Sequence, residues 1–293
     1  MSMSKSKPRS TSGRVSYDRR AITLSTLLLG LALAHTAHAD PHPLPYSYPY
    51  STLPRGMSEV EQYVDMTTVK ALDPSGSGVE GTTLRSTLVT EIEYGITDRL
   101  ELGLYLQFSN APGAGAAGTG VGDVPLRFDG VKQRLRYRFA DAGVWPVNVA
   151  IYGEVAELAH EIELEAKIIL DRRLGRWHLM ANLWGEREFY YSGRREWVAN
   201  PTGGVAFEVA PAFHVGVEYW MHGEFGAEEE EAGMSKPFAE RFHHYLGPAF
   251  LLQGTRLWVS VAPYLRLDAW DRAGQINDQF GRFWFRTIIG LEL

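Results

Sequence analysis

The chain has 293 residues, 45% of them hydrophobic, and it contains no cysteine. Disulfides and thiolate metal sites are therefore excluded. The formal net charge at pH 7 is −6. The first 39 residues hold six basic residues and one acidic residue, so the rest of the chain is more acidic still. An acidic, exported chain is a poor partner for nucleic acid, and we predict no nucleic-acid partner.

The N-terminus has the order of a secretory signal peptide. A basic region ending at Arg19 and Arg20 precedes the apolar run 21–34, and the small residues Ala37 and Ala39 follow. The apolar run is too short to span a bilayer as a helix. We predict a signal peptide over residues 1–39, cleavage after Ala39 and a mature chain that begins at Asp40. An uncleaved inner-membrane anchor is the alternative.

Residues 40–56 are rich in proline and tyrosine. Proline at this density favours an extended backbone, and the segment is too short to be a separate exported domain. We therefore predict a periplasmic arm that is either extended or a partial plug of a pore. A disordered leader is the other reading of the same composition.

From Met57 onward, apolar and polar side chains alternate in segments of about 9 to 13 residues, the pattern of transmembrane β-strands. In one hairpin, Leu88 and Ile92 fall on one face and Glu91 and Glu93 on the other. The predicted strands are 59–68, 83–94, 100–108, 129–139, 147–155, 162–170, 177–185, 197–209, 213–221, 242–252, 257–267 and 283–293. The sequence thus predicts an all-β fold, a transmembrane antiparallel up-and-down β-barrel of about 12 strands over residues 57–293.

The connections between these segments alternate in length. Short turns are predicted at 95–99, 171–175, 210–212 and 253–255, and longer Gly-rich or charged loops at 71–81, 109–125, 189–196, 223–240 and 268–281. Short periplasmic turns and long extracellular loops are typical of bacterial outer-membrane barrels. The connection at 157–161 is short where a long loop is expected. A soluble β-sandwich or lipocalin-like barrel is the alternative fold.

These features predict export through the periplasm to the outer membrane of a Gram-negative envelope. The partners that follow are outer-membrane lipids and lipopolysaccharide, the barrel-assembly machinery and an unidentified small solute.

The hairpin from Glu91 to Leu104, with its turn Gly95-Ile96-Thr97-Asp98-Arg99, resembles the outer-membrane proteins grouped with the phenol meta-cleavage pathway. The sequence Gly120-x-Gly122-Asp123 adds to the resemblance. The resemblance implies a porin-like transport barrel over residues 57–293 and passive transport of small molecules, aromatic or apolar ones among them. It transfers no ligand-binding residue to this chain.

One predicted strand carries a row of cations on a single face, and carboxylates are predicted on the same inward side of neighbouring strands. The candidate site residues are Glu91, Glu93, Glu101, Lys132, Arg134, Arg136, Arg138, Glu154, Glu163 and Glu165. Opposite charges on adjacent strands predict a salt-bridge network that fills a narrow lumen. The alternative is an anion-selective channel lined by the basic row. A filled lumen would also suit a non-conducting structural barrel or one that displays its loops.

We predict no catalytic residue, no cofactor and no metal site. The histidines are scattered without the spacing of zinc ligands. The acidic run 228–231 lies in a predicted loop, where a solvated surface competes with divalent-ion binding. Barrel lipases present a serine near an activating histidine, commonly as His-x-Ser. No histidine of this chain is followed two positions later by serine, so an enzyme is not predicted.

Overall fold

The computed structural model describes residues 40–72, 80–110, 125–231, 234–237, 241–268 and 280–293. The predicted signal peptide with its cleavage residues Ala37 and Ala39, and the sequence Gly120-x-Gly122-Asp123, lie outside the described residues. Within the described part, no helix is long and apolar enough to cross a membrane.

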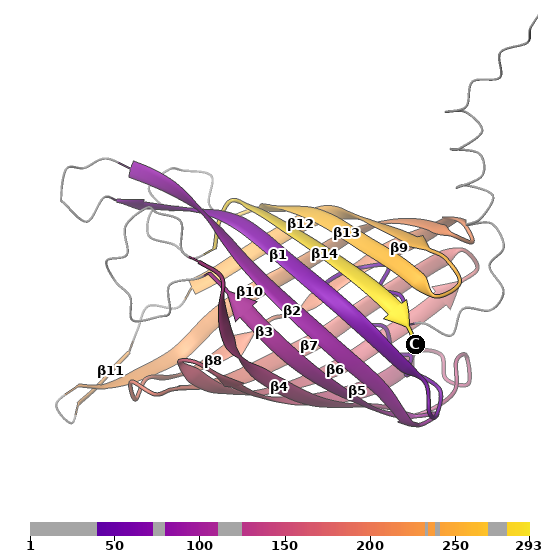
Figure 1. Cartoon of the computed structure of the whole chain (residues 1–293), viewed down its shortest axis with the longest axis horizontal. Coiled ribbons are helices and arrows are strands. Elements are labelled where there is room, and N and C mark those ends of the chain that lie inside the picture. The colour runs from indigo at the N-terminus through magenta and orange to yellow at the C-terminus, as the bar shows by residue number, and fades with distance from the viewer. Residues whose placement is uncertain (1–39, 73–79, 111–124, 232–233, 238–240, 269–279) are drawn as a thin grey trace, which may run out of the picture.

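The described residues form one antiparallel sheet that closes on itself (Figure 1). Its strands are β1 (Ser58–Leu72), β2 (Glu80–Thr97), β3 (Leu100–Ser109), β4 (Arg127–Arg138), β5 (Asn148–Leu158), β6 (Glu161–Leu174), β7 (Trp177–Tyr190), β8 (Arg195–Ala199), β9 (Thr202–Ala210), β10 (Phe213–Glu231), β11 (Met234–Pro237), β12 (Arg241–Gln253), β13 (Leu257–Arg266) and β14 (Phe283–Glu292). β1 pairs with both β2 and β14, which closes the barrel. β8 and β9 both lie between β7 and β10, and β11 pairs only with the end of β10, from Glu228 to Glu231. In the described part of the chain the barrel wall therefore has twelve strand positions, as the sequence predicts.

Side chains alternate between the outside and the lumen along each strand, because successive residues of a strand point to opposite faces. On β3, Leu104 and Leu106 are each 45% exposed, whereas Tyr105 between them is 5% exposed. Aromatic residues near the strand ends are also exposed, namely Tyr94, Phe139, Trp145, Trp177, Tyr191 and Trp197. This apolar outer surface with aromatic ends is the one that a lipid bilayer requires.

One predicted strand is interrupted. The sequence predicts a single strand over 197–209, but β8 ends at Ala199 and β9 begins at Thr202. Asn200 and Pro201 lie between them. Proline has no N–H to donate to the ladder, so a central strand cannot run through it regularly. The predicted hairpin around 157–161 is present, since β5 and β6 pair from Asn148 to Glu157 and only Ala159 and His160 separate the strands.

Residues 40–54 lie inside the barrel rather than beside it, near the end with the short turns, and the segment becomes exposed at Arg55 and Gly56 (Figure 1). Its two legs meet where the Ser51 hydroxyl donates to the Asp40 carboxylate. Between the legs the chain turns deeper in the lumen, where the Ser47 N–H donates to the Leu44 carbonyl at 3.2 Å. We call this segment the luminal arm. It enters and leaves at the same end of the barrel as the start of β1, because Thr52 donates to the Asp98 carbonyl in the β2–β3 turn.

Candidate functional site in the barrel lumen

The tip of the luminal arm is held by a carboxylate of the wall. Glu218 of β10 accepts hydrogen bonds from the backbone N–H of Tyr46 at 3.1 Å and of Ser47 at 2.7 Å. The Tyr264 hydroxyl of β13 donates to the same carboxylate. Charge-assisted hydrogen bonds are roughly twice as strong as neutral ones. Glu218 therefore fixes the turn of the arm at one point of the wall.

An amide of the wall holds the next residue of the arm at both of its backbone groups. Asn182 of β7 accepts from the Tyr48 N–H at 2.7 Å and donates to the Tyr48 carbonyl at 3.1 Å. Backbone polar groups inside a protein need such partners, since leaving them unpaired costs about 1–3 kcal/mol each. The arm forms no strand. The Asn182 side chain therefore supplies the hydrogen bonds that a neighbouring strand would supply in a sheet.

The arm also packs against the wall through apolar and aromatic contacts. Leu44 is fully buried, and its Cδ2 lies 2.8 Å from where a Cβ on Gly216 would stand. The Tyr46 ring stacks on Trp220 with centroids 4.3 Å apart, and the Arg286 guanidinium lies 3.8 Å from the Tyr46 centroid. The missing side chain at Gly216 thus makes the space that Leu44 fills.

The predicted charge network is arranged around the row of cations on β4. Arg134 contacts Glu91 at 2.7 Å, Glu101 at 2.7 Å and also Glu93. These four side chains are fully buried. Gly103 on β3 makes room for them, because a Cβ there would stand 2.5 Å from Glu91 Oε1 and 2.6 Å from Arg134 Nε.

Arg136 connects this cluster to the luminal arm. Its Nη2 lies 2.7 Å from Glu101 Oε1 and 2.6 Å from Asp40 Oδ2. The Pro49 carbonyl of the arm accepts from Nη1 at 3.4 Å. The arm is therefore part of the ion cluster and not only a neighbour of it.

The remaining predicted site residues form smaller ion clusters. Lys132 lies 3.4 Å from Glu154 and 3.1 Å from Glu163. Glu165 pairs with Lys167 at 2.7 Å. Arg138 lies at the end of β4, where it contacts Asp141 at 2.8 Å and donates to Thr52 of the arm at 3.0 Å. Each cation of the basic row thus has a carboxylate partner.

The sequence prediction omitted several lumen residues whose partners lie on the arm or far along the chain. Asp65 of β1 pairs with Arg286 of β14 at 2.7 Å and accepts from Tyr46 at 3.3 Å.

Two groups of carboxylates also have oxygens within 4.8 Å of one another, namely Glu59, Glu61 and Glu93, and Glu161, Glu163 and Glu188. The period-two alternation places Glu59 and Glu61 on the lumen face, and this signal was available in the sequence.

His42 of the arm lies in a buried and partly acidic environment. It is fully buried, neither ring nitrogen has a hydrogen-bond partner, and its Nε2 is 3.7 Å from Glu61 Oε1. Burial, and then the positive charges of Arg136 and Arg134, hold the pKa of His42 well below its ordinary value of 6.5. The imidazole of the docked arm is therefore neutral at neutral pH.

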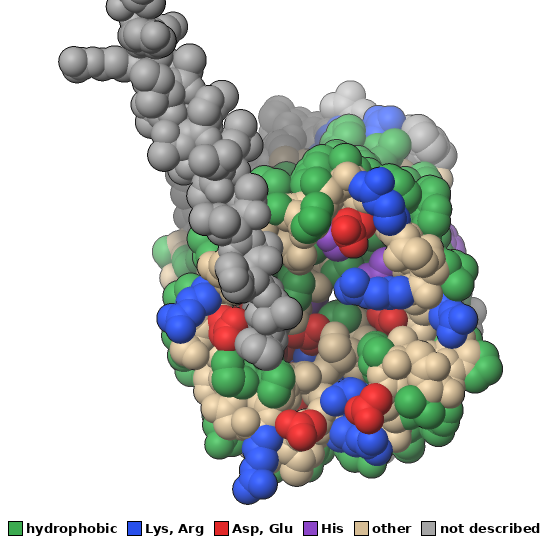
Figure 2. All heavy atoms as spheres, turned by 90° about the vertical axis from the view of Figure 1, so that its right-hand side faces the viewer, with side chains coloured by type: hydrophobic (Ala, Val, Ile, Leu, Met, Phe, Trp, Pro, Cys, Tyr) green, Lys and Arg blue, Asp and Glu red, His purple; other side chains and the backbone are tan. Residues whose placement is uncertain are grey.

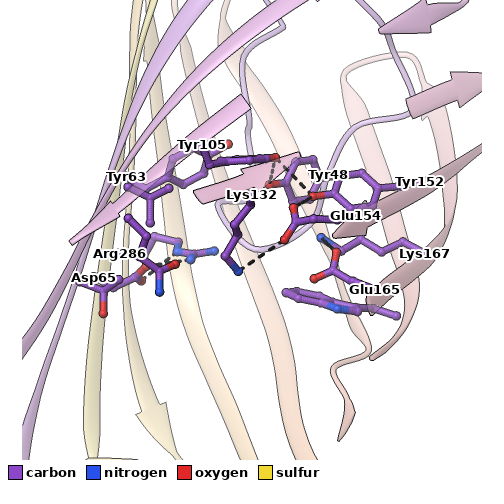
Figure 3. A pocket seen from close by; sticks show the side chains of 14 residues that line it. Tyr48, Tyr63, Asp65, Tyr105, Lys132, Tyr152, Glu154, Glu165, Lys167 and Arg286 are labelled. Atoms are coloured by element: carbon purple, nitrogen blue, oxygen red, sulfur yellow. Dashed lines mark hydrogen bonds and ion pairs between the residues drawn. The ribbon is translucent and has the colours of Figure 1, made fainter. Parts of the chain in front are cut away.

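A cavity of about 140 Å³ lies between the arm and the wall (Figure 3). Tyr48 lines the cavity from the arm. The rings of Tyr63, Tyr105 and Tyr152 line it from β1, β3 and β5. Its charged lining residues are Asp65, Lys132, Glu154, Glu165, Lys167 and Arg286. At the end with the short turns, charged side chains gather around a hollowed centre while hydrophobic side chains occupy much of the outer margin (Figure 2). The lumen thus offers aromatic faces and both signs of charge.

Comparison with solved structures supports the barrel at the level of fold. An outer-membrane channel from Pseudomonas putida F1 is 13% identical in sequence, with a TM-score of 0.55 over 83% of this chain and 98% of that one. The translocator domain of the autotransporter NalP from Neisseria meningitidis is 8% identical, with a TM-score of 0.49 over 94% of this chain and 95% of that one. No protein-family model matches this chain, and no curated protein matches it in sequence. What the chain shares with the Pseudomonas putida channel is the closed antiparallel barrel of that outer-membrane protein.

Proposed function

We propose that this chain is an outer-membrane channel for passive transport of small molecules, and that the luminal arm forms its constriction. The observation that carries the proposal is the cavity that reaches the arm at Tyr48. Its tyrosine rings and charged groups can contact a solute without enclosing it. The fold shared with an outer-membrane channel, and the resemblance to the proteins of the phenol meta-cleavage pathway, support the same class of function.

The cavity favours small aromatic solutes over simple anions. Aromatic rings prefer edge-to-face or offset contacts with other rings, and Tyr63, Tyr105 and Tyr152 offer such surfaces. Anion selectivity through the basic row is less favoured, because Lys132, Arg134, Arg136 and Arg138 each contact a carboxylate. A paired cation attracts a passing anion less strongly than a free one.

A non-conducting barrel is the second candidate, and the strength of the arm's attachment favours it. Glu218, Asn182 and Arg136 fasten the arm to three different strands. An arm held this firmly could seal the lumen permanently, leaving a structural or loop-displaying protein.

Single-channel conductance of the refolded mature protein in planar bilayers distinguishes the two. We expect small currents from the unmodified protein, partial block by added aromatic solutes and larger currents after Asn182→Ala, which loosens the arm. A correctly folded barrel that stays silent in both forms would leave the structural role. Strong anion selectivity would instead indicate that the basic row acts as the selectivity filter.

A further inference from the structure

The first residue of the predicted mature chain, Asp40, is held by the barrel wall through its backbone nitrogen and its side-chain carboxylate. The Asp40 backbone nitrogen lies 3.0 Å from Glu59 Oε2, and its side-chain Oδ2 lies 2.6 Å from Arg136 Nη2. Asp40 is 5% exposed and Glu59 is fully buried. The wall thus presents a carboxylate to the nitrogen and a guanidinium to the carboxylate of the same residue.

The surroundings of this residue contain more acids than bases. Among the described residues, a contiguous set of six carboxylates lies around the two guanidinium groups of Arg134 and Arg136. The six are Asp40, Glu59, Glu61, Glu91, Glu93 and Glu101. Buried carboxylates without balancing charge are costly. Glu61 and Glu93 each have one buried oxygen without a hydrogen-bond partner. A further positive charge at this place would therefore stabilise the cluster.

We propose that cleavage of the signal peptide between Ala39 and Asp40 supplies this charge, and that the new α-ammonium group of Asp40 forms a buried ion pair with Glu59 that fastens the luminal arm. Hydrolysis of the peptide bond consumes one water. Ala39 leaves with the new carboxylate, and the nitrogen of Asp40 becomes an amine that takes up a proton at neutral pH.

Cleavage changes the charge of the Asp40 nitrogen. The amide donates one hydrogen and carries no net charge, whereas an ammonium donates three. Glu61 and Glu93 each have an oxygen within 4.8 Å of an oxygen of Glu59, so the ammonium group would lie next to a group of three carboxylates. The ion pair depends on the predicted cleavage site, but it holds whether or not the barrel conducts.

Chemical labelling of the α-amine tests the ion pair directly. Trypsin releases an N-terminal peptide, Asp40 to Arg55, that contains no lysine, so its α-amine is its only amine. Only the neutral amine reacts, and a neighbouring carboxylate favours the charged form. We expect reductive methylation of the folded protein at pH 7 to be about tenfold or more slower than in urea. Glu59→Gln should restore most of the rate, and Glu154→Gln, a lumen carboxylate outside the group, should not.

A second experiment, extension of the N-terminus, distinguishes the effect of the ammonium charge from the effect of burying Asp40. Two residues, Gly-Ser, placed before Asp40 convert its nitrogen back to an amide. The extension should lower the thermal unfolding midpoint of the protein by several degrees and should have no further effect in the Glu59→Gln background. Folding of Glu59→Gln is judged by heat-modifiable migration in gels. If this variant does not fold, the unfolding midpoints of the extended and unextended chains that keep Glu59 still test the inference. Equal midpoints with and without the extension, equal losses in both backgrounds, or an exported protein whose first residue is not Asp40 would each overturn the inference.

Discussion

Single residues decide how firmly the luminal arm is attached. The arm has no strand partners, so side chains such as Asn182 supply the hydrogen bonds that its backbone needs. Such contacts cannot be predicted from local sequence, because Asn182 and Tyr48 are 134 positions apart. By contrast, the inward direction of Arg134 and Glu91 follows from the period of two alone. Sequence therefore predicts which residues face the lumen, and the structure is needed to pair them.

Asn182→Ala removes two hydrogen bonds from the backbone of Tyr48 and leaves both of these buried groups unpaired. At about 1–3 kcal/mol for each unpaired group, we expect the docked arm to be destabilised by about 2–6 kcal/mol. The thermal unfolding midpoint should fall while the barrel remains intact in gels. Asn110→Ala is the matched control, because Asn110 bonds to Ser86 and Leu84 of β2 and does not contact the arm. Equal effects of the two substitutions would show that the arm is not held through Asn182.

His42 should make the attachment of the arm dependent on pH. The docked arm keeps His42 neutral because its pKa is lowered by burial and by Arg136, whereas a released arm takes up a proton below about pH 6.5. The released state then binds more protons, so the stabilisation of the docked arm is fully present above pH 6.5. It weakens by up to about 1.4 kcal/mol for each pH unit below that value, until the lowered pKa is reached.

The measurement is the cleavage rate of the arm by an added protease between pH 7.5 and 5. We expect cleavage in the unmodified protein to accelerate as the pH falls, after correction for the protease's own pH profile. His42→Phe keeps the aromatic shape and should flatten the dependence. A variant with an unchanged profile would assign the acid sensitivity to other groups.

At the scale of elements, the twelve strand positions were predictable because each strand of a barrel repeats the same two-residue alternation. The interruption at Pro201 was missed because the alternation continues on both sides of it, although the proline itself was a visible signal. The position of the luminal arm was not predictable. Its prolines at 41, 43, 45 and 49 specify an extended chain, and an extended chain fits equally well outside the barrel or in its lumen.

Leu44 is the apolar anchor of the arm, and its removal should loosen the arm as a unit. Leu44→Ala leaves a cavity next to Gly216 and should cost roughly 2–5 kcal/mol. Chymotrypsin should then cut after Tyr46 or Tyr50, both buried in the docked arm. Leu252→Ala removes a leucine from the outer surface, where it is 52% exposed, and should leave the arm protected. If Leu44→Ala stays resistant to chymotrypsin, the polar contacts alone are sufficient to hold the arm.

At the scale of the whole molecule, the proposed transport requires solute either to pass beside the docked arm or to displace it. The chain has no cysteine, so an introduced pair forms an unambiguous cross-link. The Ser47 Oγ and Thr202 Oγ1 are 3.0 Å apart, which brings the arm tip close enough to β9 for a disulfide. We expect Ser47→Cys with Thr202→Cys to lower the conductance when oxidised, and a reductant to restore it.

Each single-cysteine variant is the control for this pair, and neither should respond to reductant. Equal currents in the oxidised and reduced double variant would mean that solute passes beside a stationary arm. Oxidation that silences the channel completely would mean that the arm must leave the lumen for any passage.

The attachment of the arm also constrains the order in which the molecule is assembled. The arm precedes every strand in the chain, yet its tip is held by Glu218, 172 positions after Tyr46, and the Pro45 carbonyl accepts from Arg286, 241 positions away. Contacts of such long sequence separation form slowly, because the intervening chain must be ordered first. We therefore expect the luminal arm to dock last, so that an occupied lumen would report that the barrel around it is complete.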